Sequence, residues 1–312
     1  MENFLLALEV IFPIVVNLAL GYTMKRAGIF DDTTVKKMNA SVFKVFLPLL
    51  LFYNVCTTDV KTAFDAKLIS YSVLSIAACF LILLIIVPRF EKDNKRRGAL
   101  IQGIFRSNFI IFGMPVAMSL CNPEDIGSVS LLIAVIAPTF NVLAVITMEI
   151  FRGSKINVLQ IIKGVITNPL IIASALGLIF AGFSIQIPPL LNKCISDITK
   201  ITNPLALILL GASFTFGSVK GYTKELIAGL LGRLVIVPAI FLPLASALGF
   251  RGGDMVALMV LFASPAAVSS FIMAEQMEGD GALAGQLIVL GSVLSVFTVF
   301  IWILILKGLM LI

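Results

Sequence analysis

The sequence contains no histidine, and only 13% of its 312 residues carry a charge. The missing histidine excludes a Ser–His catalytic pair and any zinc, haem or proton-relay site built on imidazole. The sequence also lacks the G-x-x-x-x-G-K-[ST] phosphate loop, which excludes ATP hydrolysis through that motif. Its four cysteines stand singly, without a C-x-x-C pair, and indicate no disulfide. We therefore expect no enzyme activity, no metal site and no cofactor.

Apolar residues are abundant instead, at 59% of the chain, and the mean hydropathy is +1.09. Soluble domains average about 45–50% apolar and roughly 25% charged residues. The apolar runs are about 20 residues long, enough for a helix to cross a bilayer, and they do not alternate as barrel strands do. The net charge of +6 comes from basic residues between these runs. We predict an all-α integral membrane protein in a lipid bilayer, with no nucleic-acid partner.

Ten apolar segments between charged or Gly/Pro breaks predict ten membrane-spanning helices. The expected limits are 4–24, 38–58, 67–88, 98–120, 127–151, 159–182, 190–216, 223–248, 254–276 and 282–307. Most Lys and Arg residues fall in the connections after the odd-numbered spans. The positive-inside rule makes that side cytoplasmic. We therefore expect a multi-pass protein of the cell (cytoplasmic) membrane with both termini outside.

The two halves of the chain show signs of an internal repeat. PIVVNLALG from Pro13 and PLIIASALG from Pro169 share Pro and Ala-Leu-Gly, and the same separation aligns the prolines of LPLLLF and NPLALI. We predict a five-helix repeat in residues 1–156 and a second in 157–312. Since five is odd, the second repeat is inverted in the membrane, as is common in secondary transporters.

The fourth span contains the sequence RSNFIIFGMP, which is unusual for a plain membrane anchor. Arg106 lies well inside the hydrocarbon, where a charge costs at least about 2.5–3.5 kcal/mol. Ser107 and Asn108 follow it directly. Pro115 deprives the carbonyl four residues earlier of its donor, and Gly113 permits unwound backbone. A half-helix that starts here would present free N–H groups to a carboxylate. Alternatively, Arg106 snorkels to the surface and Pro115 only kinks the helix.

The ninth span, ALMVLFASPAAVSSFIMAEQM, carries a second proline at mid-span. We expect Pro265 to correspond to Pro115, so that the fourth and ninth helices are broken and cross each other. Small residues that allow close helix packing are the alternative explanation. The expected crossover residues are Gly113, Pro115 and Pro265, and the expected substrate-binding residues are Asn108, Arg106, Ser107, Ser264 and Ser269.

Two further cations fall inside spans. Arg233 in the eighth span is expected to pair with an acid such as Glu149 or Glu275, or to snorkel. Lys44 in the second span suggests no role. Acidic residues lie toward the span ends, which argues weakly against a carboxylate-driven proton pump. Sodium held by main-chain carbonyls would leave no trace in the sequence, so coupling to Na⁺ or H⁺ stays open.

These features together resemble the auxin efflux carrier family, which includes bacterial members and the plant PIN-FORMED carriers. The likeness covers the ten spans, LPLLLF, the N-x-x-x-x-G-x-P of span four and SPAAVSSFIMAEQ. In the plant carriers an Asn seven residues before the span-four crossover proline contacts the substrate carboxylate; Asn108 holds that place here. Pro265 matches the span-nine crossover proline. The long cytoplasmic loop of many plant carriers is missing, as in the short bacterial form.

The resemblance implies a bile-acid-carrier-like fold that works as an elevator. Helices 1, 2, 6 and 7 would be the scaffold, and helices 3–5 and 8–10 the moving transport domain. It further implies a small mono- or dicarboxylate as cargo and admits a homodimer through the scaffold. The expected function is therefore a secondary transporter of organic anions. A sodium-coupled symporter of the bile acid carrier type is the alternative, and a channel or a membrane-embedded enzyme or sensor is less favoured.

Overall fold

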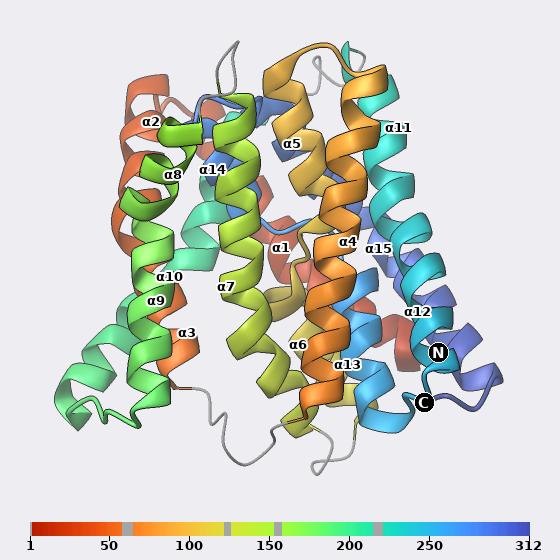
Figure 1. Ribbon diagram of the computed structural model, residues 1–312. Coiled ribbons are helices and arrows are strands. Elements are labelled where there is room, and N and C mark those ends of the chain that lie inside the picture. Colours follow the sequence, from red (N-terminus) through yellow and green to blue (C-terminus); the bar gives the residue numbers. More distant parts are fainter. Residues whose placement is uncertain (1, 58–64, 122–125, 153–157, 215–220) are drawn as a thin grey trace.

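The computed structural model describes residues 2–57, 65–121, 126–152, 158–214 and 221–312. Within these ranges all regular elements are helices, which run between the two ends of one bundle (Figure 1). Both termini lie at the same end (Figure 1). The first half contains α1 (Glu2–Arg26), α2 (Asp32–Ser41), η1 (Val42–Phe46), α3 (Leu47–Cys56), α4 (Ala66–Phe90), α5 (Asn94–Phe105), η2 (Phe109–Gly113), α6 (Met114–Leu120) and α7 (Ile126–Phe151). The second half contains α8 (Val158–Thr167), α9 (Pro169–Gly182), α10 (Pro189–Ser213), α11 (Thr223–Leu231), η5 (Gly232–Ile236), α12 (Val237–Ala247), α13 (Gly252–Ala263), α14 (Ser269–Gln276) and α15 (Gly281–Gly308).

Each of the ten expected segments overlaps one of these helices or a consecutive group of them. Six stretches of the described chain are long and apolar enough to cross a membrane, and they are residues 32–56, 66–90, 127–151, 189–213, 223–247 and 281–308. A bent pair, α8 and α9, would make a seventh, with an angle of 56° at its break. The stretches 109–120 and 252–263 are shorter apolar helices. Length and composition thus support an all-helical fold with six or seven membrane spans.

Short polar side chains set where many of the helices begin. Asp31, Asp65, Asp93, Asn168 and Asp280 each stand directly before a helix and accept a hydrogen bond from an N–H of its first turn. These amides have no acceptor within the helix, so a capping oxygen replaces water for them. The distances run from 2.6 Å at Asp31 to 3.0 Å at Asn168. Four of these helix starts fall in the breaks between the expected spans, whereas Asn168 starts α9 inside the expected span 159–182.

Three spans contain a π-helical turn shortly before a proline. The segments η1, η2 and η5 are each followed, two residues on, by a proline: Pro48, Pro115 and Pro238. A proline has no N–H and crowds the carbonyl four residues earlier. The wider turn shifts the bonding by one residue, so that the first N–H after each segment donates five residues back. These bonds join Leu47 to Val42, Met114 to Phe109 and Val237 to Gly232.

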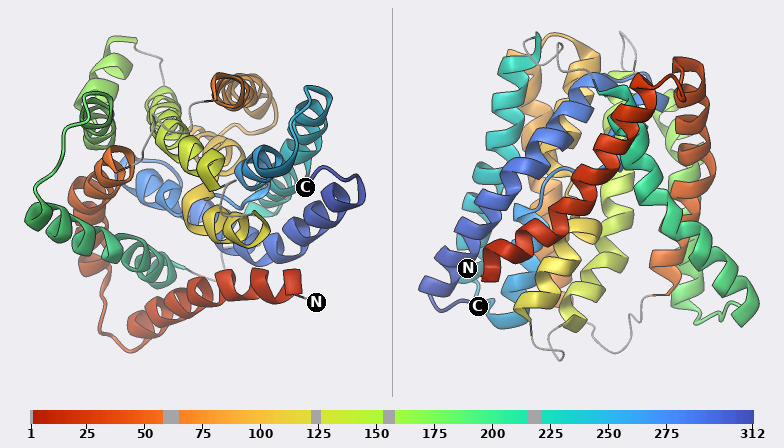
Figure 2. Two further views of the ribbon diagram at one scale, coloured as in Figure 1. Left: turned by 90° about the horizontal axis from the view of Figure 1, so that it is seen from below. Right: turned by 180° about the vertical axis from the view of Figure 1, so that it is seen from behind.

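Glycines bring the backbones of α1 and α10 into direct contact. A Cβ on Gly21 would lie 1.8 Å from the carbonyl oxygen of Ile208, and one on Gly211 would lie 2.1 Å from that of Leu18. Figure 2 shows α1 and α10 crossing on the face opposite to that of Figure 1. The helices α3 and α9 pack in a similar way. Small residues that admit such close approach are typical of helix pairs in membranes.

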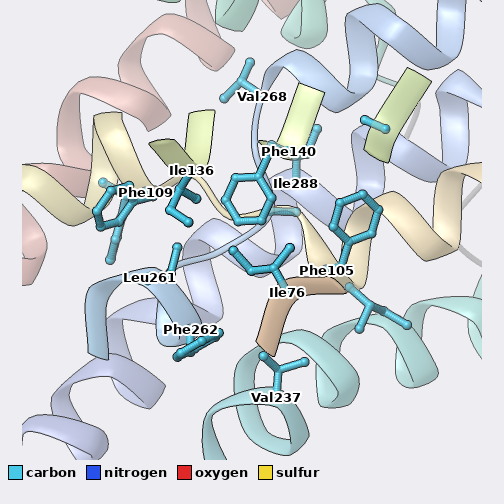
Figure 3. Packing of buried hydrophobic residues seen from close by; sticks show 14 of the residues in the cluster. Ile76, Phe105, Phe109, Ile136, Phe140, Val237, Leu261, Phe262, Val268 and Ile288 are labelled. Atoms are coloured by element: carbon cyan, nitrogen blue, oxygen red, sulfur yellow. The ribbon is translucent and has the colours of Figure 1, made fainter. Parts of the chain in front are cut away.

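The core lies around the middle of the bundle, where α5, α7, α13 and η2 meet. Phe105, Phe109, Phe140 and Phe262 are buried there, and Figure 3 shows their rings packed with aliphatic side chains from neighbouring helices. The rings of Phe105 and Phe140 have centroids 6.1 Å apart. Large apolar side chains also cover the outside of the bundle, for example on α4, α9 and α15. An apolar exterior of this extent suits a lipid environment.

We predict that Gly21→Ala destabilises the fold, because the new methyl group would collide with main-chain atoms of α10 rather than with a flexible side chain. Overpacking of this kind costs about 1–3 kcal/mol. Thermal melting of the purified protein in detergent should show a lower midpoint. Gly308→Ala is the matched control, since a Cβ there meets nothing within 4 Å. Equal midpoints for the two variants would contradict the close contact.

Candidate functional site

Two helix breaks lie against each other in the middle of the bundle. One separates α5 from η2, and the other separates α13 from α14. Ser107 and Ala266 form an isolated antiparallel bridge between them. The N–H of Asn108 donates to the Pro265 carbonyl at 2.7 Å, and the N–H of Ala267 donates to the Arg106 carbonyl at 3.3 Å. The two unwound segments therefore provide hydrogen-bond partners for part of each other's main chain. Unwound backbone at membrane depth requires such partners within the protein.

The first break lies earlier in the chain than the sequence suggested. Unwound backbone occupies residues 106–108, whereas Gly113 is helical, with φ −70° and ψ −42°. Pro115 is the second residue of α6, a position where a missing N–H is tolerated. Pro265 does lie in a break, opposite Asn108. Gly113 serves packing instead, because a Cβ there would lie 3.2 Å from the Val260 side chain of α13.

A cavity of about 80 Å³ lies beside the crossing. Four of the expected substrate-binding residues line it: Arg106, Ser107, Asn108 and Ser269. Ser264 does not line it, and its hydroxyl donates to the Val260 carbonyl of its own helix at 2.5 Å. The remaining lining residues are Leu47, Leu50, Leu51, Asn54, Phe109, Ile110, Ile111, Ala137, Phe140, Asn141, Asn203, Ala267 and Val268. The walls are thus mainly apolar, with a polar group of side chains at the crossing.

Arg106 is the cation of this cavity, and it neither snorkels nor meets an acid. It is only 4% exposed. Its Nη2 donates to the Asn141 Oδ1 at 2.5 Å, and its Nη1 donates to the Gln102 Oε1 at 3.3 Å and to the Met273 sulfur at 2.7 Å. All three partners are neutral, and no ion pair with Arg106 is found in the described part of the chain. Its positive charge is therefore available to an anion.

Asn108 and Ser107 add hydrogen-bonding groups whose capacity is unused. The Asn108 Nδ2 and the Ser107 Oγ are buried and have no partner among the residues that the structure describes. A buried polar group without a partner costs about 1–3 kcal/mol. Both residues line the cavity, so a ligand placed there could satisfy them.

The second half-helices start at the cavity and add to its positive potential. Phe109 begins η2, Ser269 begins α14, and both residues line the cavity. The first amides of a helix have no intrahelical acceptor, and its N-terminus carries about +0.5 of a charge. The N-termini of η2 and α14 and the residue Arg106 therefore lie at a single small space.

Three polar residues of the cavity, Asn54, Asn141 and Asn203, were not among the expected substrate-binding residues. Asn141 holds Arg106 in place, and its own Nδ2 donates to the Ala137 carbonyl at 2.8 Å. Asn203, in the middle of α10, also lines the cavity. For Asn141 and Asn203, the available signal was an Asn close to a mid-span proline, Pro138 in one case and Pro204 in the other.

The other two cations inside the expected spans, Arg233 and Lys44, lie in very different surroundings. Arg233 pairs with neither Glu149 nor Glu275: all its hydrogen bonds go to main-chain carbonyls at the two breaks. It is 2% exposed and does not snorkel. Lys44 lies in η1 with an exposed side chain.

A second, larger cavity of about 590 Å³ adjoins the first. It lies between α1, α6 and α10, and its lining includes Asn17, Pro115 and Ser119. Ile111 and Asn203 line both cavities. These two residues mark where the two cavities adjoin.

Comparison with known proteins is consistent with this geometry. A family model described as membrane transport protein matches residues 6–163 and 156–303. The chain belongs to this family, the auxin efflux carrier family. It is 23% identical to the uncharacterized transporter MJ1031 of Methanocaldococcus jannaschii over 306 residues, which cover 96% of this chain and 98% of the relative. An uncharacterized transporter of Methanothermobacter thermautotrophicus is 22% identical over 302 residues, with coverages of 94% and 96%. The protein is thus a multi-pass membrane protein of a transporter family, with a small molecule to be moved across a bilayer.

Proposed function

We propose that the protein is a secondary transporter that carries a small organic carboxylate across the cytoplasmic membrane, with the carboxylate bound at the helix crossing. The observation that carries this proposal is the cavity where Arg106, without an acidic partner, meets the unsatisfied Asn108 amide. Members of the same family are named as transporters.

The charges at the crossing favour an anion over a cation or a neutral molecule. The guanidinium contributes one positive charge, and the two helix N-termini contribute about +0.5 each. In the described part of the chain no Asp or Glu lines the cavity. A carboxylate is acceptor-only and offers about four lone-pair sites. It could therefore take hydrogen bonds from the Asn108 Nδ2, the Ser107 hydroxyl and Arg106 at once.

The walls of the cavity indicate what surrounds the carboxylate. Leu47, Leu51, Phe140 and Val268 present apolar surface next to the polar group. Arg106 is the single cation among the lining residues of the described chain. This pattern favours a cargo with one anionic head and an apolar remainder. A second carboxylate would find no second cation there.

The position of the cavity supports an elevator mechanism. Leu47 and Asn54 belong to α3 and Asn203 to α10, which lie in the proposed scaffold. Asn108 and Val268 belong to the two breaks, which lie in the proposed transport domain. A site between the two sets of helices would change its access when one set slides past the other. The proposed transport domain comprises α4–α7 and α11–α15, and the scaffold comprises α1–α3 and α8–α10.

The inverted repeat that such a mechanism uses is supported by matched helix lengths. The half-helices α5 and α13, which precede the two breaks, have 12 residues each. Close contacts also recur: Gly21 faces the Ile208 carbonyl, and Gly177 faces the Phe52 carbonyl, each pair joining one half of the chain to the other. The separation between Pro13 and Pro169 also relates Gly21 to Gly177 and Phe52 to Ile208. With both termini outside, the Lys- and Arg-rich end of the bundle is cytoplasmic.

We predict that a carboxylate stabilises the protein through Asn108. A ligand that binds only the folded state raises the melting temperature by mass action. A thermal-shift screen of mono- and dicarboxylates should therefore give a shift in the wild type that is lost in Asn108→Ala. Ser264→Ala is the matched control, because the Ser264 hydroxyl bonds to its own helix and does not line the cavity.

Sodium in place of potassium in the same screen distinguishes the alternative function. A shift that requires sodium would favour a sodium-coupled symporter of the bile acid carrier type, and coupling to H⁺ would appear as a dependence on pH. If no carboxylate shifts the melting temperature of the folded wild-type protein, the proposal of an anionic cargo is wrong. A homodimer through the scaffold is tested separately by the mass of the purified particle.

We further predict that Asn141→Asp abolishes carboxylate binding while the fold is retained. The new carboxylate would replace the amide oxygen 2.5 Å from the Arg106 Nη2. Its negative charge would form an ion pair with Arg106 and leave no net positive charge for the cargo. The charge-assisted hydrogen bond to Arg106 is stronger than the neutral one and offsets the lost donor to the Ala137 carbonyl, so the melting temperature should change little. Titration with the best carboxylate of the screen measures the loss. Undiminished affinity in Asn141→Asp would show that Arg106 does not bind the cargo.

A further inference from the structure

Arg233 contacts both broken helices at once. It lies in η5, in the eighth apolar segment, and is buried. Its Nη1 donates to the carbonyls of Ile104 and Phe105, at 3.1 and 3.3 Å. Its Nη2 donates to the Leu261 carbonyl at 2.8 Å, and its Nε donates to the Ser264 carbonyl at 2.7 Å. One guanidinium thus binds the C-terminal ends of α5 and α13, which come from different halves of the chain.

Each of these four carbonyls has lost its helical donor through a break. The donor for Leu261 would be the nitrogen of Pro265, which has no hydrogen. The donor for Ile104 would be the N–H of Asn108, which binds Pro265 across the crossing instead. The donors for Phe105 and Ser264 would be the N–H groups of Phe109 and Val268, which make no such bond across the breaks. Arg233 therefore replaces the hydrogen bonds that the breaks remove.

The charges match as well as the hydrogen bonds. A helix C-terminus carries about −0.5 of a charge, so two of them together approach the single positive charge of one guanidinium. No acid pairs with Arg233 in the described ranges. With the C-termini compensated, the positive N-termini of η2 and α14 and the charge of Arg106 determine the potential in the cavity.

The segment that carries Arg233 is itself held in place. Pro238 leaves the Leu234 carbonyl without its helical donor, and the indole Nε1 of Trp302 on α15 donates to that carbonyl at 3.1 Å. The residue next to Arg233 is thus tied to a neighbouring long helix. A fixed guanidinium can hold both breaks in one register.

We propose that Arg233 is a positioning residue, which binds both half-helix C-termini and thereby keeps the two breaks paired so that Asn108 and Ser269 face one cavity. The register is that of the Ser107–Ala266 bridge. The consequence for anion binding rests on the proposed function; the pairing of the breaks does not.

Hydrogen exchange of the purified protein measures the pairing without a ligand. In Arg233→Met we expect the amides of segments 106–108 and 264–268 to exchange about tenfold faster or more, because both breaks lose their shared donor. The main-chain amides of α1 and α10 at the contact between these helices should stay protected from exchange. Arg233→Lys preserves the charge but lacks the planar fork of donors, so it should restore part of the protection, and it serves as the test if Arg233→Met does not fold.

Arg97→Met is the matched control. Arg97 also donates to main-chain carbonyls, those of Glu91 and Pro88, but only at the end of one helix, α4. Its loss should leave both breaks protected. Faster exchange at only one break in the Arg233 variants, or a uniform increase along the whole chain, would overturn the positioning role.

Titration with benzoate, and with neutral benzamide for comparison, connects the pairing to binding. We expect Arg233→Met to weaken benzoate binding about tenfold or more, Arg233→Lys to recover part of it, and Arg97→Met to leave it unchanged. If the wild type binds neither benzoate nor any other carboxylate but the exchange pattern holds, the proposed function fails and the positioning role stands. If benzoate binds equally well to Arg233→Met, the positioning role fails.

Discussion

Every main-chain polar group inside a bilayer needs a partner within the protein, and the fold of this chain follows from that requirement. Continuous helices meet it by themselves. The two broken helices do not, and the free main-chain groups at their breaks find hydrogen-bond partners in different ways. The unwound segments bond to each other through Asn108 and Ala267. The C-terminal carbonyls bond to Arg233. The N-termini of η2 and α14 lie at a cavity through Phe109 and Ser269, where a ligand can be a further partner.

The same requirement explains the distribution of charge. Two arginines are buried near the crossing, and neither has an acidic partner in the described chain. Arg233 is neutralised by helix C-termini, because carbonyl dipoles supply its negative counterpart. Arg106 is held by neutral side chains, among them Asn141, and keeps its charge for the cavity. In the two proposals, Arg233 therefore positions the breaks and Arg106 binds the cargo.

The sequence predicted much of this arrangement, because apolar runs and mid-span prolines leave visible traces. The ten apolar segments all overlap helices, and Arg106, Ser107, Asn108 and Ser269 line one cavity. The site of the first break was misplaced toward Gly113. A proline after a π-helical turn does not break a helix, and the sequence does not show that turn in advance.

Contacts between distant segments were beyond sequence reasoning. Arg233 and its carbonyl partners on α5 lie far apart in the chain, and carbonyls carry no residue-type signal. For the same reason Asn141 could not be assigned to Arg106, although its position near a mid-span proline was a usable hint. Side-chain pairs of opposite charge are what a sequence suggests, and here the partners of both buried arginines are neutral.

The central claim is that the crossing binds a carboxylate, and a structure of the protein with 4-bromobenzoate tests it most directly. Bromine locates the ligand independently of its shape. The account predicts a carboxylate within about 3 Å of the Asn108 Nδ2 and of the Arg106 guanidinium, with the bromine against the apolar wall. Ligand found only in the larger cavity between α1, α6 and α10, with the crossing unchanged, would contradict it.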